Sequence, residues 1–196
     1  MPCFVPYSVS MPTKSSKPKV RVLSSKEMFR GPVFYVTSDQ VVEPGGLKVR
    51  RDIVRHSGSV VILAVDENRR LPRVLLERQY RHAAASFLWE LPAGRIDEGE
   101  DTLTAARREL LEETGYTASR WQVALRFFAS PGFVAEVMNL YLARDLHAGR
   151  ARPEEDEIIH KRFFPLPAAM RMIMARKIRD AKTIAGVLWL RQFFSR

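Results

Sequence analysis

The chain of 196 residues has a single cysteine, Cys3, so it holds no disulfide framework and no cysteine-based zinc site. It has no run of eighteen apolar residues, which excludes a transmembrane helix and a membrane partner. Its N-terminus lacks the ordered basic, apolar and cleavage regions of a secretory signal, so we expect a cytoplasmic location. With 46% hydrophobic and 28% charged residues, the composition is that of a soluble globular protein with one buried core.

Acidic residues are scarce at the two ends of the chain. The 32 basic and 22 acidic residues give a net charge of +10. Residues 1–30 account for +5 and residues 158–196 for +8, which leaves −3 for the residues between them. Proteins that bind nucleic acid usually gather basic and aromatic side chains on one surface. Basic ends are more typical of solvated tails and helix faces, so we do not expect a nucleic-acid partner.

The chain divides into three stretches. Proline and serine are frequent in residues 1–18, which predicts a disordered tail. Residues 19–56 contain two β-rich segments, 33–36 and 47–54, on either side of a Pro-Gly turn signal, so we expect an N-terminal antiparallel β arm. Residues 57–196 form the main domain, with expected strands at 59–65, 72–80, 121–128, 138–143 and 158–164, and expected helices at 103–113, 167–175 and 181–194.

The strands and helices do not follow a regular βαβ alternation. This order predicts the α/β (α+β) class, with a mixed β-sheet sandwiched between helices rather than a doubly wound sheet. Gly115 is expected to end the first helix as its C-cap, and Asp180 is placed to be the N-cap of the last helix.

Three carboxylates stand on one side of the first helix. Glu109, Glu112 and Glu113 have i, i+3 and i+4 spacing, which places them within about one-third of a turn of one another. Like charges at this spacing destabilise a helix, and a divalent cation such as Mg²⁺ or Mn²⁺ is one reason to group them. The alternative is a solvated acidic face that is neutralised by Arg107 and Arg108.

The loop before this helix completes a longer pattern. Gly94 opens a mostly polar loop, and Arg108 stands four residues before Glu112, so it can hold that carboxylate in place. The pattern matches the Nudix box, G-x5-E-x7-R-E-U-x-E-E-x-G-U with U apolar or aromatic, and the chain therefore resembles the Nudix hydrolases. The matching residues are Gly94, Glu100, Arg108, Glu109, Leu110, Glu112, Glu113, Gly115 and Tyr116.

This resemblance implies a Nudix-type fold in which residues 57–196 are the catalytic domain. It also implies hydrolysis of a nucleoside diphosphate that is linked to another moiety, with Mg²⁺ or Mn²⁺ as the cofactor. The implied metal ligands are Glu109, Glu112, Glu113 and the backbone carbonyl of Ala93. Within the box, Arg108 and Glu112 are the implied catalytic residues.

Outside the box, the chain resembles one subgroup of this family, the ADP-ribose pyrophosphatases. The matching segments are 78–81, 90–94, 130–136, 154–157 and 177–185. The resemblance implies hydrolysis of ADP-ribose or a related nucleoside diphosphate sugar to AMP and a sugar phosphate. It also implies a homodimer whose arms, residues 20–56, are exchanged and complete the adenosine pocket. Two alternatives stay open: another substrate such as GDP-mannose or a dinucleotide, and a module that binds a nucleotide or RNA without catalysis.

Five residues outside the box are candidates for substrate binding. The guanidinium of Arg81 can bind two phosphate oxygens, or it can form a strand-end salt bridge. Arg51 and Arg55 are candidates for the same role, or are solvent-exposed strand charges. Gly132 is expected to need unusual backbone angles that let the chain approach the substrate closely. The alternative is that it belongs to an ordinary turn. Glu136 is expected to touch metal-bound water or to be a surface carboxylate.

An acidic segment later in the chain supplies candidates for the general base. Attack on phosphorus needs a water that loses a proton. In the resembling subgroup, the base is often a glutamate on a loop outside the box. Glu155 and Glu154 are the first candidates and Glu157, next to the expected strand, ranks after them. If this segment is only a solvated loop, Glu112 is the candidate that remains.

Overall fold

Two β-sheets and three α-helices form the fold in the computed structural model, which describes residues 20–150 and 160–195. The strands are β1 (Arg21–Arg30), β2 (Tyr35–Val42), β3 (Lys48–Arg55), β4 (Ser59–Asp66), β5 (Arg73–Arg81), β6 (Ser86–Glu90), β7 (Ala93–Arg95), β8 (Tyr116–Phe128), β9 (Val137–Ala148) and β10 (His160–Pro165). The helices are α1 (Thr102–Thr114), α2 (Leu166–Met174) and α3 (Ala181–Phe193), with a short 3-10 helix, η1 (His82–Ala84). No helix in the described part of the chain is long and apolar enough to cross a membrane.

The larger sheet has seven strands in the order β10-β5-β4-β9-β8, with β6 beside β5 and β7 beside β4. β4 and β9 are parallel, and the other neighbours are antiparallel. β4 is central and six of its eight residues are buried, as expected for a run of Val, Ile, Leu and Ala with both faces covered. β4 and β5 pair only at Val65–Val74 and Asp66–Arg73. Beyond these pairs β4 joins β7 and β5 joins β6, so the sheet splits between them.

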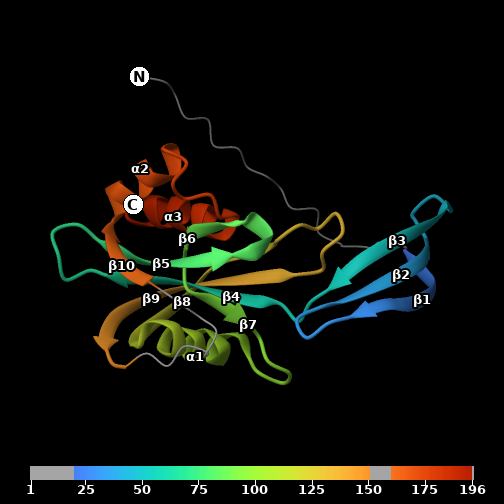
Figure 1. The fold of residues 1–196 in the computed structure, drawn as a ribbon, viewed down its shortest axis with the longest axis horizontal. Coiled ribbons are helices and arrows are strands. Elements are labelled where there is room, and N and C mark those ends of the chain that lie inside the picture. Colours follow the sequence, from blue (N-terminus) through green and yellow to red (C-terminus); the bar gives the residue numbers. More distant parts are fainter. Residues whose placement is uncertain (1–19, 151–159, 196) are drawn as a thin grey trace, which may run out of the picture.

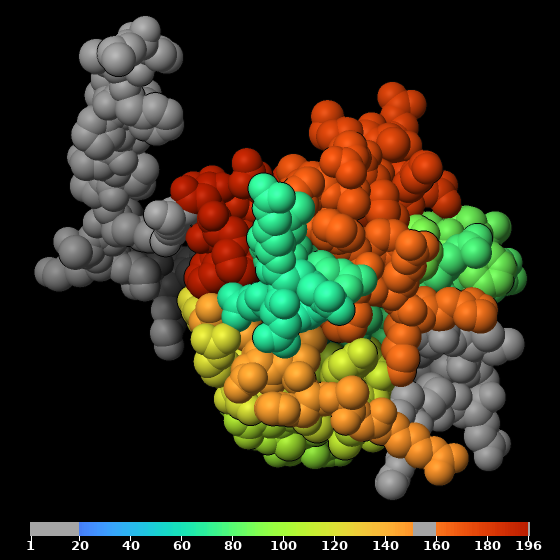
Figure 2. All heavy atoms as spheres, turned by 90° about the vertical axis from the view of Figure 1, so that its left-hand side faces the viewer, coloured from blue at the N-terminus to red at the C-terminus, as the bar shows by residue number. Residues whose placement is uncertain are grey.

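Helices cover both faces of this sheet (Figure 1). Alternate side chains of β4 point to opposite faces, so Ile62 shares a core with Leu110 of α1, whereas Leu63 shares a core with Leu190 of α3. Figure 2 shows the layers from the end of the molecule, with α2 and α3 above the β4–β5 connection and α1 with β8 and β9 below it. The predicted mixed sheet between helices is confirmed.

The ends of two helices follow the sequence signals. Asp101 precedes α1 and accepts hydrogen bonds from the N–H groups of Leu103 and Thr104, and Gly115 ends the helix with a left-handed φ of 73°. Asp180 accepts a hydrogen bond from Thr183 N–H at the start of α3. The predicted caps at Gly115 and Asp180 are therefore confirmed.

The smaller sheet is an antiparallel arm, residues 21–55, which projects from the rest of the described chain, here called the body (Figure 1). β2 and β3 confirm the predicted hairpin, but the strand β1 was not predicted. The arm has a single layer, and all ten residues of β1 are exposed. Its exposed apolar side chains include Val22, Leu23, Met28 and Phe29.

Three hydrogen bonds join the arm to the body. Val54 N–H donates to Phe133 O at 2.8 Å, and Val54 O accepts from Ala135 N–H at 2.9 Å. From β7, Arg95 Nη1 donates to the carbonyl of Pro32, in the β1–β2 turn, at 2.9 Å. The arm is therefore fastened to the loop after β8 and to the strand that opens the predicted box.

The residues on either side of segment 151–159, which lies outside the described residues, both contact the C-terminal end of α1. Gly149 N–H donates to Gly115 O at 2.7 Å, and Lys161 Nζ donates to Thr114 O. The predicted strand 158–164 is observed from His160 onward. The predicted tail, residues 1–18, also lies outside the described residues.

Candidate functional site

Helix α1 presents the three carboxylates to strand β7. Glu113 is buried, and its Oε2 accepts a hydrogen bond from Ala93 N–H at 3.1 Å. Glu109 lies against Gly94, where an added Cβ would stand only 1.9 Å from the Glu109 carboxyl carbon. A side chain at position 94 would therefore occupy the space of the Glu109 carboxylate and push it out of place, which explains the glycine that opens the box.

Arg108 holds two of these carboxylates. Its Nη1 donates to Glu109 Oε1 at 2.8 Å and to Glu112 Oε2 at 3.1 Å. Its Nε and Nη2 donate to Glu100 at 3.1 and 2.9 Å, and Nη2 also donates to the carbonyl of Arg95 at 3.0 Å. The hydrogen bond with Glu100 is the largest of the effects that raise the pKa of Arg108, so the guanidinium stays charged. Arg108 thus joins the loop of the box to its helix.

These groups line one cleft of about 560 Å³ at the split between β4 and β5. Ser59 of β4, Arg81 of β5 and Ala93 of β7 lie on its walls together with the carboxylates of α1. The cleft brings together most of the residues that the sequence suggested. Those that line it are Arg81, Ala93, Arg108, Glu109, Glu112, Glu113 and Glu136.

Arg81 enters the cleft from a buried network of charges. Its Nε and Nη2 donate to the two oxygens of Glu90, each at 3.0 Å, and Lys182 Nζ donates to one of those oxygens. Burial raises the pKa of Glu90, but the hydrogen bonds from Arg81 and the charge of Lys182 outweigh it and hold that pKa below its usual range. Asp180 Oδ1, 3.0 Å from Lys182 Nζ, completes the network. Arg81 therefore both forms the predicted strand-end salt bridge and faces the cleft.

Sequence reasoning missed Lys182, which also lines the cleft. A lysine in the first turn of a helix opposes the helix dipole, and this conflict is a signal for a buried acidic partner. The next residue, Thr183, accepts a hydrogen bond from Leu91 N–H at 2.8 Å. Helix α3 therefore holds the segment that leads into Ala93 and Gly94.

Glu136 lies in the same cleft beside two residues that sequence reasoning also missed. Ser59 Oγ donates to Glu136 Oε1 at 2.6 Å, and His56 Nδ1 lies 3.9 Å from the same oxygen. His56 opens the short connection between β3 and β4, and Ser59 is the first residue of β4. No local motif marks them, because only the fold brings them to the cleft.

Three other candidates lie outside the cleft. Arg51 forms an ion pair with Glu43 on the arm, and Arg55 pairs with Asp39. The unusual backbone angle expected at Gly132 is wrong: its φ is not left-handed, an added Cβ would meet no atom within 4 Å, and the residue lines neither of the two cavities described here. The turn forms with ordinary angles because Val134 N–H bonds back to Ser130 O at 2.9 Å.

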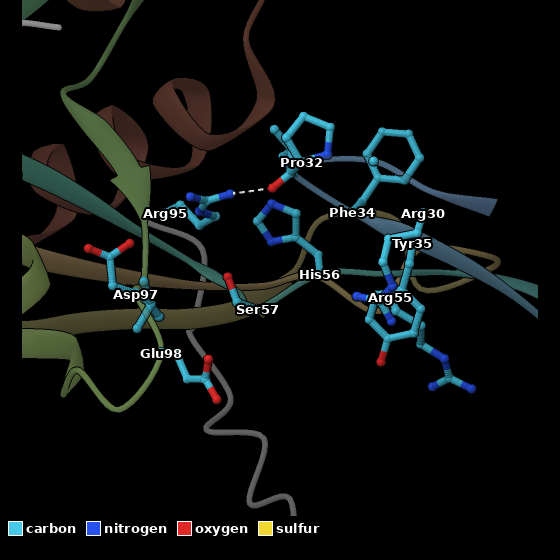
Figure 3. A pocket seen from close by; sticks show the side chains of 13 residues that line it. Arg30, Pro32, Phe34, Tyr35, Arg55, His56, Ser57, Arg95, Asp97 and Glu98 are labelled. Carbon is cyan, nitrogen blue, oxygen red and sulfur yellow. Dashed lines mark hydrogen bonds between the residues drawn. The ribbon is translucent and has the colours of Figure 1, made fainter. Parts of the chain in front are cut away.

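A second cavity of about 450 Å³ lies where the arm meets the body (Figure 3). The β1–β2 turn supplies Phe34 to it, β2 supplies Tyr35, and β3 supplies Arg55. This arm-side cavity continues into the cleft through lining residues that the two share, which are Pro32, Val33, His56, Arg95 and Asp97.

The donor chemistry of the cleft fits a divalent metal ion. Three carboxylates and the carbonyl of Ala93 are hard oxygen donors of the kind that Mg²⁺ and Mn²⁺ prefer. The glycine at position 94 keeps β7 against Glu109. Within residues 20–150 and 160–195, no three His, Cys, Asp or Glu side chains already form a metal-ligand group. Because Arg108 donates to Glu109 and Glu112, a bound cation would compete with it for these oxygens.

The candidates for the general base outside the box, Glu154, Glu155 and Glu157, lie outside the described residues. Their roles therefore stay predictions. Both flanks of their segment are fastened at the end of the helix that carries Glu112 and Glu113.

Comparison with known proteins adds independent findings. The NUDIX domain family matches residues 55–186. An ADP-ribose pyrophosphatase of Mycobacterium tuberculosis is 40% identical over 169 residues, 85% of this chain and 80% of that protein. An ADP-ribose pyrophosphatase of Bacillus subtilis is 32% identical over 172 residues, 87% of this chain and 91% of that protein. A crystal structure of an ADP compounds hydrolase, 24% identical, shares the fold with a TM-score of 0.76 over 93% of this chain and 97% of its own.

Proposed function

The chain belongs to the Nudix hydrolase family, and from this premise we propose that it hydrolyses the pyrophosphate bond of ADP-ribose, with Mg²⁺ as cofactor, to give AMP and a sugar phosphate. One observation carries the proposal. The cleft holds the carboxylates of the box and the cations Arg81 and Lys182 together, which suits a diphosphate that is bound through both metal and protein. The M. tuberculosis and B. subtilis relatives, both called ADP-ribose pyrophosphatases, support this choice of substrate.

The proposed metal ligands are Glu109, Glu112, Glu113 and the carbonyl of Ala93. When bound, Mg²⁺ or Mn²⁺ would neutralise phosphate charge and increase the acidity of a water. Arg108 keeps Glu109 and Glu112 in place by hydrogen bonds from one nitrogen, so the carboxylates do not have to be gathered when the ion arrives.

The proposed role of Arg81 is to bind a phosphate oxygen. Glu90 takes its Nε and one N–H of Nη2, which leaves the Nη1 group for the cleft. The side chain is 42% exposed although Glu90 is buried, so it is both fixed and accessible. In the reaction, water adds to phosphorus, the bond to the bridging oxygen breaks, and that oxygen leaves on the second phosphate.

Glu136 and Arg55 are proposed to act around the metal site rather than as metal ligands. Glu136 accepts a hydrogen bond from Ser59, which holds it as an acceptor for metal-bound water. Arg55 lines the arm-side cavity, and we propose that this cavity binds the nucleoside end of the substrate. Phe34 and Tyr35 offer aromatic surface there.

The general base is proposed to be Glu155 or Glu154, and Glu112 is the next candidate.

We also propose a homodimer built through the arm. Among the described residues, no apolar layer covers this single-layer sheet, whose first strand is wholly exposed. Apolar surface of this kind marks an interface. The exposed residues Val22, Leu23, Met28 and Phe29 supply this surface, and a second copy would cover it.

Incubation with ADP-ribose and Mg²⁺, with the products identified, tests the proposal. We expect AMP and ribose 5-phosphate in equal amounts, and no reaction in excess EDTA. GDP-mannose and a dinucleotide in the same assay identify a different substrate if either is cleaved faster. Binding of ADP-ribose without any cleavage would instead favour a non-catalytic module, and RNA binding that weakens steeply with salt would favour the RNA-linked role.

A further inference from the structure

His56 lies at the joint between the cleft and the arm-side cavity. It is one of the residues that line both cavities, and its side chain is only 12% exposed. In Figure 3 its ring lies among the lining side chains, beside the hydrogen bond between Arg95 and Pro32. A substrate that extends from one cavity into the other therefore passes the lining residues that the two share, His56 among them.

The backbone fixes which ring nitrogen carries the proton. Gly58 N–H donates to His56 Nδ1 at 3.0 Å, so Nδ1 presents a lone pair and the proton of the neutral ring is on Nε2. This hydrogen bond depends on a tight turn in which Gly58 has a φ of +100°. The connection between β3 and β4 thus makes His56 a hydrogen-bond donor at Nε2.

Nothing in the described residues accepts a hydrogen bond from Nε2. Of the side chains that line the same cavity, Arg55 and Arg95 are cations, and Arg95 already donates to the carbonyl of Pro32. The carboxylates of Asp97 and Glu98 also line this cavity, but neither is a hydrogen-bond partner of His56 in the described structure. Glu136 Oε1 lies 3.9 Å from Nδ1, beyond hydrogen-bond distance, and accepts from Ser59 instead. A nearly buried N–H that lines a cavity without an acceptor is suited to a ligand oxygen.

We propose that His56 Nε2–H donates a hydrogen bond to the substrate at the joint, and that His56 thereby determines the preference for substrates that fill both cavities. This inference rests on the proposed function. The acceptor is an oxygen of the nucleotide half, either a phosphate oxygen or a ribose hydroxyl. His56 acts in binding, so its contribution belongs in KM and the dissociation constant rather than in kcat.

Two substitutions separate this role from a structural one. In His56→Asn, Oδ1 replaces Nδ1 as the acceptor for Gly58 N–H, but no donor remains at the position of Nε2. In His56→Gln, the amide nitrogen replaces the Nε2 donor, but the acceptor for Gly58 is lost. A role in substrate binding harms the Asn variant more, whereas a role in the turn alone harms the Gln variant more.

The experiment measures kcat and KM for ADP-ribose, its dissociation constant by calorimetry, and thermal unfolding for all three proteins. We expect His56→Asn to raise KM and the dissociation constant by about 10- to 100-fold, with kcat and the unfolding temperature near wild type. We expect His56→Gln to raise them less than His56→Asn does. Repeating the titrations with ADP-ribose that lacks the 2′- or 3′-hydroxyl of its adenosine identifies the acceptor, because the effect disappears with a deoxy ligand only if that hydroxyl accepts.

The outcomes separate this inference from the proposed function. If wild type cleaves or binds ADP-ribose and His56→Asn has the same KM and dissociation constant, or if His56→Gln is the more damaged variant, the inference is overturned and the proposed function stands. If wild type binds ADP-ribose without cleaving it, the proposed function fails, and the dissociation constants still decide the role of His56. If wild type does neither, both are overturned.

Discussion

The arm and the body are stabilised in different ways. In the body, β4 lies between two apolar cores, with six of eight residues buried. In the arm, no residue of β1 is buried, and the most buried side chains of β2 are Thr37, Asp39 and Val41. The body gains its stability from apolar burial, whereas the arm depends on strand pairing and polar contacts. The comparison teaches that the cleft is built on a self-sufficient core, while the arm leaves apolar side chains such as Phe29 exposed.

The largest effect is expected from the carboxylates of the body. Glu112→Gln and Glu113→Gln keep the shape of the side chain and remove its charge, so each should lower kcat by at least about 100-fold. The free energy of unfolding should be unchanged or slightly higher, because repulsion between carboxylates along α1 is relieved. The matched control is Glu67→Gln, which removes a carboxylate that pairs with Arg120 and Arg144 away from the cleft. Near-wild-type kcat in both box variants would contradict the metal assignment.

The second-largest effect is expected from the segment between Gly149 and Lys161, which carries the proposed general base. Glu155→Gln or Glu154→Gln should lower kcat by about 100-fold and change KM little, as for a group that acts in the transition state. The acidic limb of the pH profile of kcat should disappear with the true base. Glu157→Gln, at the candidate that ranks last, should have the smallest effect of the three. If the single variants and the double variant all stay within about tenfold of wild type, Glu112 becomes the leading candidate.

A smaller effect on catalysis is expected from the arm. Phe29→Asp places a charge on the exposed strand β1, so it should convert the proposed dimer to a monomer and raise KM for ADP-ribose about tenfold, with kcat nearly unchanged. Light scattering and steady-state kinetics measure the two changes. Ser24→Asp adds the same charge at a polar position of the strand and should leave the dimer intact. A monomeric wild-type protein at micromolar concentration would refute the dimer.

The mildest test compares a buried carboxylate of each region. Glu90→Gln removes the partner of Arg81 and Lys182, so it should lower the free energy of unfolding of the body by about 3 kcal/mol at neutral pH. The pKa of Glu90 is lower in the folded protein than in the unfolded chain. Its stabilisation is therefore present above the unfolded pKa, about 4.3, and is lost as the pH falls through the lower folded value. Urea unfolding should show wild type and variant converging in acid.

The counterpart in the arm is Asp39. Hydrogen bonds from Ser25 lower its pKa more than burial raises it, and Thr37 and Arg55 add to the lowering. Asp39→Asn should loosen the arm and leave the unfolding transition of the body in place. Hydrogen exchange of β1 to β3, measured against β4, checks this difference. Equal loss of protection in both sheets would show that the arm and the body unfold as one unit.

The sequence predicted the elements whose side chains face a core or carry a cap. β4 is an apolar run, β5 contains the apolar segment Val74–Leu76, and α1 ends at a glycine that takes the left-handed conformation. β1 escaped prediction because a strand with no buried face has no apolar alternation to reveal it. β6 and β7, with five and three residues, are too short to show a period.

The candidate site also contains residues that the sequence could predict and residues that it could not. The carboxylates, Arg108 and Gly94 lie within one continuous motif, so their spacing alone indicated that they meet. Lys182 and His56 come to the cleft from distant elements, and only the packing of α3 and the turn at Gly58 brings them there. Strand position could not show that Glu43 and Asp39 engage Arg51 and Arg55, because such pairs depend on the register between strands.

The fastening of Gly149 and Lys161 to the last turn of α1 has an evolutionary consequence. When both ends of a stretch of chain are pinned at one place, each doubling of its length costs only about 0.6 kcal/mol in closure entropy. Insertions and deletions between these two anchors would therefore leave the helix that carries Glu112 and Glu113 undisturbed.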